Sequence, residues 1–444
     1  MRENNQLSLE FKMISGKKVT ADFTGGEVSS DGGVLVLREI VERIGIIDKF
    51  SEAIKDTRHQ SYISHDIKML LTQRILQIAC GYEDADDADD LRSDPVFKAA
   101  CNRLPSDSDL ASQPTMSRFE NNLTARDIYR IGMALIEQFI ASYEAPPEGI
   151  ILDIDDTDDP THGAQQMSLF NGYYDEYCYQ PLFIFEGISG KLITSILRPG
   201  KRPCGKETCA IIKRVVNRIR EVWPKVGIII RGDSHFATPE LYKWCDKHDV
   251  HYVLGLTGNP MLKTQGLSAL VAARNDYNAS GEKARAFREI KYQASSWNRE
   301  RRVIIMAEVS EQGDNIRFTV TSLKSSQPSF IYETVYCGRG KMENFIKDHK
   351  VALKSGRTSC HSFMANFFRL MLHSAAYAIL HTLREKALNG TEFAAAQFDT
   401  IRLRLLKVGT EVREMKTKIH FILPSSYPLK NVFTAMCKTI AMQI

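Results

Sequence analysis

Carboxylates close two of the most apolar runs in this chain. Asp153 and Asp155 end the run that begins at Ile150, and Asp233 ends the run 226–232. Short apolar runs with polar boundaries are typical of strands that are buried in a sheet. We therefore expect an α/β protein in which buried strands carry acidic side chains at their ends.

A third carboxylate, Glu343, lies near the start of a basic helix. Tyr336, Arg339 and Lys350 accompany it at intervals of three, four and seven residues, which return to one face of an α-helix. Taken alone, such a helix is more often a solvated amphipathic face. Its position after two acidic strand ends favours a shared site.

Carboxylates from strand ends and from a helix can together hold two hard divalent cations. Mg²⁺ takes a few oxygen ligands from a protein and keeps its other positions for water and phosphate, and Mn²⁺ could replace it. Two such ions, about 3.5 to 4 Å apart, can activate a hydroxyl on one side of a phosphate and stabilise the departing oxygen on the other. The pattern indicates phosphodiester chemistry with two Mg²⁺ ions as cofactors.

The overall composition fits a soluble protein with more than one domain. Its 444 residues exceed one core, and its nine cysteines contain no CxxC pair, which favours reduced thiols in a cytosolic protein. A net charge of +4 is too small to indicate nucleic acid by itself, so any basic surface must be local. The apolar stretch 363–380 contains Asn366, Arg369 and His373, so no membrane span is expected there.

The first part of the chain is expected to be mostly helical. One helix should run from Ser64, as its N-cap, to Cys80. Another should cover 113–119, where a proline near the helix start suits a helix whose N-terminus meets a phosphate backbone. That segment could belong to a helix-turn-helix reader of DNA, although a packed surface helix is the more frequent case.

From Gly149 the pattern changes to three strands, a helix and a further strand ending at Asp233. This is the order of a ribonuclease H-like core, in which the first and the returning strand can lie side by side and bring Asp155 to Asp233. The expected strands are 150–155, 177–185 and 192–197, and the expected helix is 206–223. The expected regions are a mostly helical N-terminal DNA-binding domain at 1–147, the ribonuclease H-like catalytic core at 148–257 and 336–387, an inserted β subdomain at 258–335, and a helical and hairpin C-terminal region at 388–444. After Lys354 the chain is expected to be helical to about Ala387 and then to form a hairpin around Gly409.

Three separated blocks resemble those of insertion-sequence transposases of the DDE class, within the ribonuclease H-like or retroviral integrase-like superfamily. The Tyr-Arg-Glu-Lys signature of one group is matched in full by Tyr336, Arg339, Glu343 and Lys350. The runs 152–163 and 231–236 resemble the two aspartate blocks of this group. The run 172–179 resembles the continuation of the first block that is found in the IS-thirteen-eighty type. The resemblance covers roughly residues 10 to 430.

The resemblance implies that Asp155, Asp233 and Glu343 are the catalytic residues and the metal ligands. Asp153 lies on the same face of its strand as Asp155 and remains an alternative first ligand. Asp155 is preferred because it precedes Thr157 by two positions, as the first aspartate of the family precedes a threonine.

The resemblance also implies side chains that contact DNA. Tyr336, Arg339 and Lys350 are expected to bind phosphate oxygens. In relatives an inserted subdomain supplies an aromatic ring that stacks on a base flipped from the duplex, and Trp297 is placed for that role with Arg299 beside it. A tryptophan in the core of the β subdomain is the alternative.

The activity that the resemblance implies is DNA transposition. Such a protein binds the terminal inverted repeats of its insertion sequence, cleaves the ends and transfers their 3′ hydroxyls to target double-stranded DNA. Pairing two ends implies a homodimer on DNA, and we expect a bacterial cytoplasmic protein associated with the nucleoid and not with a membrane. A stand-alone metal-dependent nuclease of the same fold, and a DNA-binding regulator with an unused site, are the alternatives.

Overall fold

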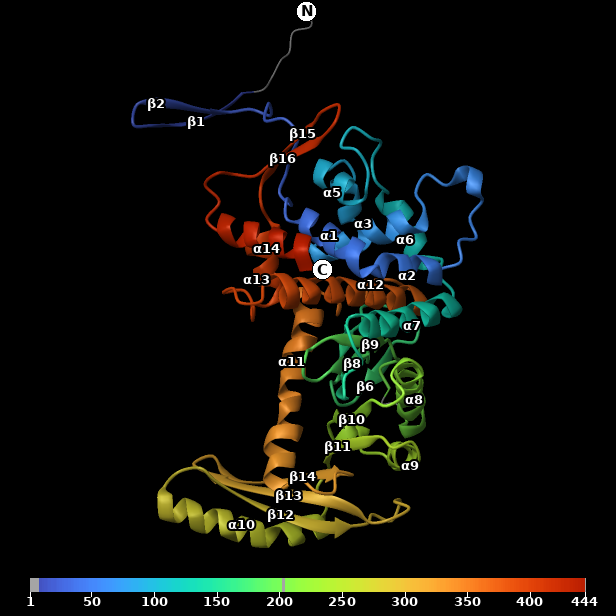
Figure 1. Ribbon diagram of the computed structural model, residues 1–444, viewed down its shortest axis with the longest axis vertical. Coiled ribbons are helices and arrows are strands. Elements are labelled where there is room, and N and C mark those ends of the chain that lie inside the picture. Colours follow the sequence, from blue (N-terminus) through green and yellow to red (C-terminus); the bar gives the residue numbers. More distant parts are fainter. Residues whose placement is uncertain (1–7, 202–203, 444) are drawn as a thin grey trace, which may run out of the picture. The chain divides into compact units, whose positions relative to one another are not determined.

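The computed structural model describes residues 8–201 and 204–443 and divides into two compact units (Figure 1). Unit 1 comprises the segments up to Ser51, Asp56–Phe119 and from Ile379 onward. Unit 2 comprises Glu52–Lys55 and Glu120–Ala378. The acidic strand ends and the Tyr-Arg-Glu-Lys residues all belong to unit 2.

Unit 2 is built on an eight-stranded sheet in the order β12-β13-β14-β11-β10-β4-β8-β9. Its strands in chain order are β4 (Gly149–Asp156), β8 (Leu182–Glu186), β9 (Leu192–Ile196), β10 (Gly227–Gly232), β11 (His251–Leu256), β12 (Ala284–Tyr292), β13 (Arg301–Ser310) and β14 (Gly313–Thr321). The helices that pack on it include α7 (Ala125–Ala141), α8 (Gly205–Val222) and α9 (Pro239–Lys247). Mixed strand directions with helices between them confirm the expected α/β class.

The first five strands of this sheet have the ribonuclease H-like order that the sequence predicts. Strand β8 pairs antiparallel with β4 and with β9, whereas β10 returns on the other side of β4 and runs parallel to it. Arg231 on β10 is opposite Asp153 on β4, so the same register continued by two residues places Asp233 level with Asp155. The expected proximity of Asp155 and Asp233 follows directly from this register.

The expected single strand 177–185 is two strands in the structure. Pro181 interrupts it, because proline has no N–H to donate to a sheet ladder. The first part, β7 (Glu176–Tyr179), pairs with β5 (Asp159–Pro160) and β6 (Leu169–Asn171) in a separate three-stranded sheet. Only the second part, β8, joins the large sheet.

The segment expected to be a β subdomain extends the large sheet. Strand β14 pairs antiparallel with β11, and β13 and β12 follow it outward. A long helix that the sequence analysis did not predict, α10 (Pro260–Ser280), lies across these strands (Figure 1). Its buried face consists mainly of the small residues Gly266, Ala269 and Ala273, which give little hydrophobic periodicity.

The helical segment Phe330–Ala352 carries the Tyr-Arg-Glu-Lys residues and is irregularly wound. It has wide turns at Phe330–Tyr336 and Asp348–Ala352, a tight 3₁₀ turn at Cys337–Arg339, and regular α-helix only in α11 (Gly340–Lys347). Because these forms have different numbers of residues per turn, the intervals three, four and seven do not fix the face of each side chain as they would in a regular α-helix.

Helix α12 (Phe363–Thr382) begins later than expected, since the chain from Lys354 to Ser362 is not helical. Among the described residues, the stretch Phe363–Ala387 is the one helix long and apolar enough to cross a membrane by length and composition. However, 83% of its most apolar window is buried inside the structure, which is typical of a core helix.

Unit 1 combines both ends of the described chain. Its helices are α1 (Val34–Ile44), α2 (Ile46–Ala53), α3 (Ile67–Ala79), α4 (Asp87–Leu91), α5 (Pro95–Ala100), α6 (Gln113–Asn121), α13 (Phe398–Ile401) and α14 (Lys430–Gln443), of which α2 and α6 run into unit 2. Its strands are β1 (Leu9–Ile14), β2 (Lys17–Ala21), β3 (Val28–Ser29), β15 (Thr410–Glu414) and β16 (Ile419–Ile422). Strand β15 pairs with both β3 and β16, and Lys407 forms a 2.7 Å ion pair with the buried Asp31.

Two local expectations in unit 1 are wrong. The N-cap of α3 is Asp66 and not Ser64, because the Asp66 carboxylate accepts a hydrogen bond from the backbone N–H of Met69. The C-terminal hairpin turns between Met415 and Lys418, where the Met415 N–H bonds to the Lys418 carbonyl, and not around Gly409.

Candidate functional site

Asp155 and Asp233 open into one polar cavity of about 740 Å³ at the ends of β4 and β10. The two side chains come from neighbouring parallel strands, so the sheet itself holds them together. The cavity is lined by Asp155, Asp156, Phe170, Asn171, Gly172, Tyr173, Tyr174, Gln180, Gly200, Lys201, Asp233, Ser234, His235 and Thr257. It joins the first two predicted catalytic residues.

Asp153 is not available to a ligand. Its side chain is 0% exposed and is held at both oxygens by Arg231, whose Nη2 and Nε lie 2.6 and 2.5 Å from Oδ2 and Oδ1. Arg231 also donates from Nη1 to the carbonyl of Val335 at 2.6 Å, which ties the irregular helix to the sheet. Of the two candidates for the first ligand, this arrangement favours Asp155.

Asp155 is paired with the arginine of the signature. Arg339 Nη1 donates to Asp155 Oδ2 at 2.7 Å. Burial raises the pKa of the Asp155 carboxyl to about 7, with Arg339 acting against this and the charge of Asp233 adding to it. Asp155 and Asp233 therefore repel each other in the cavity, and the positive charge of Arg339 offsets part of that repulsion.

The neighbouring Asp156 has a different environment. The buried Arg198 donates from Nη2 to Asp156 Oδ2 at 2.7 Å, and His235 Nδ1 lies 3.6 Å from the same oxygen. Burial raises the pKa of Asp156, but its bonds to His235 and Arg198 outweigh that effect and lower it. Asp156 is thus a fixed anion that holds the end of β4 in place.

The Tyr336 hydroxyl lies close to the turn that follows Asp233 at the end of β10. The Asp233 carboxylate accepts from the N–H of His235 at 2.8 Å and so caps the short turn Ser234–Phe236. A Cβ at Gly255 on the next strand would lie 2.6 Å from the Tyr336 hydroxyl and 3.0 Å from the backbone N of Ser234. Glycine at 255 therefore gives the phenol room to approach the Asp233 turn.

Lys350 is anchored to the loop that follows β4. Its Nζ lies 2.8 Å from Asp158 Oδ1 and 3.2 Å from Thr157 Oγ1. Burial raises the pKa of Asp158, but the ion pair with Lys350 outweighs this and lowers it. Lys350 thus fixes the far end of the irregular helix next to the strand that carries Asp155.

The structure does not bring Glu343 to the two aspartates. Its side chain is exposed and lies outside the cavity, whereas its neighbour Met342 is buried and Phe345 packs on Phe185 with 5.6 Å between ring centroids. Within residues 8–201 and 204–443, no three His, Cys, Asp or Glu side chains are grouped so that they could hold a metal ion.

The inserted strands place Trp297 in a hydrophobic core. Its side chain is 6% exposed and packs edge-on against Tyr242 and Tyr292, with centroids 5.3 and 5.4 Å away. This is the packing alternative, and a ring in this position cannot stack on a base without leaving the core. Arg299 is exposed and pairs with Asp246 at 2.6 Å.

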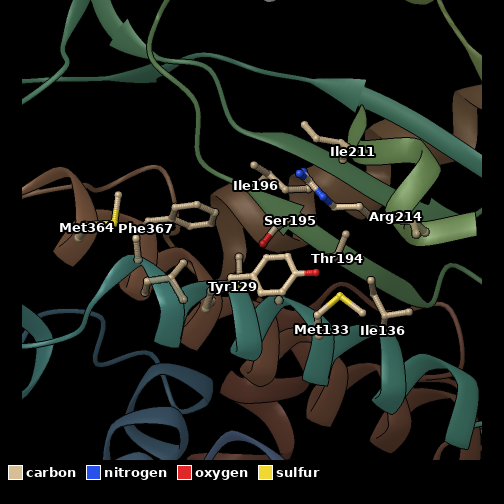
Figure 2. A pocket seen from close by; sticks show the side chains of 15 residues that line it. Tyr129, Met133, Ile136, Thr194, Ser195, Ile196, Ile211, Arg214, Met364 and Phe367 are labelled. Carbon is tan, nitrogen blue, oxygen red and sulfur yellow. The ribbon is translucent and has the colours of Figure 1, made fainter. Parts of the chain in front are cut away.

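Figure 2 shows a second cavity in unit 2, of about 220 Å³, between α7, β9, α8 and α12. Its walls are apolar side chains such as Met133, Ile136 and Phe367, and Arg214 is the single charged residue among its lining residues. It contains no carboxylate and is therefore unsuited to a divalent cation.

Several residues in or next to the acidic cavity were not predicted from the sequence. Arg198 and Arg231 lie behind the cavity, within or just after apolar strands, and only the folded register gives them aspartate partners. His235 and Tyr174 lie inside the blocks that carry the family resemblance, so a closer reading of those blocks could have found them.

Comparison with known families identifies the chain. The family described as transposase DDE domain group 1 matches residues 11–443, so this protein belongs to that family. It is a DDE transposase, an enzyme class that recombines DNA and generally uses divalent metal ions. No match was found among curated protein sequences.

A solved structure described as the piggyBac transposase synaptic complex with hairpin DNA is similar over 86% of this chain and 80% of that chain. The sequence identity is 12% and the TM-score is 0.42. A likeness this remote does not transfer the roles of individual residues.

Proposed function

We propose that this transposase cleaves DNA at the terminal inverted repeats of its own insertion sequence and transfers the freed 3′ hydroxyls to target DNA in a Mg²⁺-dependent reaction. The observation that carries the proposal is the meeting of Asp155 and Asp233 in one cavity at the ends of adjacent parallel strands. The phosphate of the cleaved bond would lie in this cavity.

The donor set fits divalent cations. Asp155 and Asp233 offer hard oxygen ligands from a rigid sheet. Burial and mutual repulsion disfavour their ionised forms, and a bound cation would offset that cost. When bound, Mg²⁺ ions supply Lewis acidity and lower the pKa of an attacking water or hydroxyl. Asp155, Asp233 and Glu343 would hold them.

The cationic and phenolic side chains around the cavity would position the DNA. Arg339 offers a planar fork that suits two phosphate oxygens, whereas Lys201 and Lys350 act as point charges. The hydroxyl of Tyr336, beside the Asp233 turn, can donate to a phosphate oxygen. None of these groups needs to form a covalent bond to DNA.

Glu343 must move to complete the site, and the irregular helix supplies the means. Arg339 lies one helical turn before Glu343 and donates a hydrogen bond to Asp155. It therefore occupies the position beside Asp155 where Glu343 would help to hold the cations. Gly338 and Gly340 flank Arg339 and lower the cost of rewinding the segment. We propose that Arg339 leaves Asp155 for DNA phosphate as Glu343 turns inward.

The same proposal covers partners and location. Two element ends must be paired before joining, so the active form would be a homodimer on double-stranded DNA. We propose a bacterial cytoplasmic location at the nucleoid, where such a substrate is found.

A labelled duplex of the element's own end tests the proposed function. The protein is incubated with this duplex, unlabelled target DNA and Mg²⁺, and nicks, hairpins and joined products are resolved on a denaturing gel. Cleavage followed by joined products supports transposition. Cleavage without joining would indicate a stand-alone nuclease, and binding without cleavage would indicate a regulator with an unused site.

A further inference from the structure

The hairpin of β1 and β2 has no partner within the described chain. The two strands form their own two-stranded sheet, and every residue in them is exposed except the half-buried Val19. Figure 1 shows the hairpin extending away from the helices of unit 1. An isolated two-stranded hairpin is marginally stable in water, so this ribbon needs a surface to bind.

The two faces and the tip of the ribbon differ in chemistry. The pairs Leu9 with Ala21 and Phe11 with Val19 make one face apolar, and the pair Glu10 with Thr20 lies on the other. At the tip, Ser15 and Gly16 turn the chain with positive φ angles of 48° and 80°.

The outer end of the ribbon is strongly cationic. Lys12, Lys17 and Lys18 are exposed, form no ion pair with any described residue, and surround the tip residues Met13 and Ile14. The side chains of Met13 and Ile14 are 62% and 67% exposed. A protein without a bound partner would expose two large apolar side chains and three lysines together at this tip, which indicates that the tip binds a partner.

Charge decides between two possible occupants. A second copy of the chain would bring six lysines together at a symmetric contact, with only Glu10 of each ribbon to offset them. Duplex DNA supplies the opposite charge along its whole length, and its major groove admits a two-stranded ribbon. DNA is therefore the partner that suits the lysines.

We propose that the β1–β2 ribbon is an arm that grips duplex DNA. Lys12, Lys17 and Lys18 bind phosphates on either side of the major groove, and Ile14 at the tip makes an apolar contact with the groove floor. The arm reads no base hydrogen bonds, so it increases affinity for all sequences alike. This inference rests on the proposed function, since it assigns a further contact to the same DNA.

The triple variant K12Q/K17Q/K18Q tests the arm. Binding of the full-length protein to a 40-base-pair duplex is measured by fluorescence anisotropy between 50 and 200 mM salt. The slope of log affinity against log salt should become shallower by about 2 to 3, because each phosphate contact contributes about 0.9. The exposed lysines of K225Q/K243Q/K247Q provide a control of equal charge change, and its slope should stay near wild type.

A second pair of variants keeps the result independent of folding. Ile14→Ser should weaken binding to duplexes of any sequence and leave the slope of log affinity against log salt unchanged. Its circular dichroism spectrum should match that of wild type. Phe11→Ser tests the alternative partner by sedimentation velocity without DNA. A wild-type salt slope in the lysine triple variant, or a dimer that dissociates on Phe11→Ser while DNA binding persists, would overturn the arm.

These outcomes are separable from failure of the proposed function. If the chain does not cleave its element end, wild type gives no product with Mg²⁺, yet the salt slopes of all variants can still be read. If the arm alone is wrong, cleavage persists and the slopes of the two triple variants coincide.

Discussion

The strand-borne half and the helix-borne half of the candidate site are organised in opposite ways. Asp155 and Asp233 are set by the hydrogen-bonded register of β4 and β10, which fixes where each strand ends. Glu343 sits on a segment whose winding changes three times between Phe330 and Ala352. The sheet therefore supplies a fixed platform, whereas the third carboxylate would join it only through the proposed inward turn of Glu343.

The contacts that hold the helix explain this division. Arg231 ties Val335 to the sheet, Arg339 bonds to Asp155, and Lys350 bonds to Asp158. Between the last two contacts, Glu343 is exposed and forms no ion pair with any residue that the structure describes. The segment is therefore held by contacts at Val335, Arg339 and Lys350, and Glu343 lies on its exposed side between the last two.

The largest effect should come from the platform. Asp155→Asn and Asp233→Asn should each reduce single-turnover cleavage of the element end on the order of 10³-fold or more, because each removes a negative oxygen ligand from a cation site. Asp276→Asn, an exposed change on α10, is the control and should cleave like wild type. DNA affinity should be largely retained in all three, and near-normal cleavage by either site variant would break the assignment.

Glu343→Gln tests whether the helix joins the platform. If Glu343 turns inward when DNA and Mg²⁺ bind, this variant should lose cleavage to nearly the same extent as the aspartate variants, on the order of 10³-fold. The measurement is the same single-turnover assay, with Glu333→Gln on the same helical segment as the matched control. A loss of only a few fold would mean that the exposed position of Glu343 is also its working position.

Arg231→Met should destabilise unit 2 by about 3 to 5 kcal/mol, because it leaves the buried Asp153 charge without its partner. Urea unfolding followed by tryptophan fluorescence gives the free energy of unfolding. The double variant Arg231→Met/Asp153→Leu should recover much of the loss, since it removes both charges. If the single variant is as stable as wild type, the pair does not anchor the helix to the sheet.

Arg339→Gln should have the smallest effect and sharpens the comparison most. Cleavage should fall about 10- to 100-fold through the lost phosphate contact. Without DNA, however, Mn²⁺ should bind the variant more tightly than wild type in calorimetric titration, because Asp155 is no longer engaged by a guanidinium. Arg339→Lys should give intermediate affinity. Weaker Mn²⁺ binding by the glutamine variant would show that Arg339 does not compete for Asp155.

The same contrast explains how much could be predicted from the sequence. Strand ends are predictable because short apolar runs with polar boundaries fix where the buried strands β4 and β10 lie. The single face assumed for Arg339 and Glu343 failed because the winding of the helix depends on tertiary contacts such as Arg231 with Val335. No local pattern reports such contacts.

Other misses have similar physical causes. Helix α10 buries mainly small residues, so its sequence lacks the periodic pattern of large hydrophobic residues from which a helix is predicted. Trp297 could have been either a DNA contact or a core residue, and only the positions of Tyr242 and Tyr292 decide for packing. The interruption of 177–185 was visible in Pro181 and should have been predicted.

The pairing of β3 with β15 has a consequence for how the protein is made. Strand β3 is synthesised early, yet it must wait for β15 and for the Lys407 partner of Asp31 before unit 1 can close. The ribosome will have delivered all of unit 2 by then. The candidate site is therefore synthesised before unit 1 is complete, and a chain arrested after Ala378 would contain that site without the C-terminal segment of unit 1.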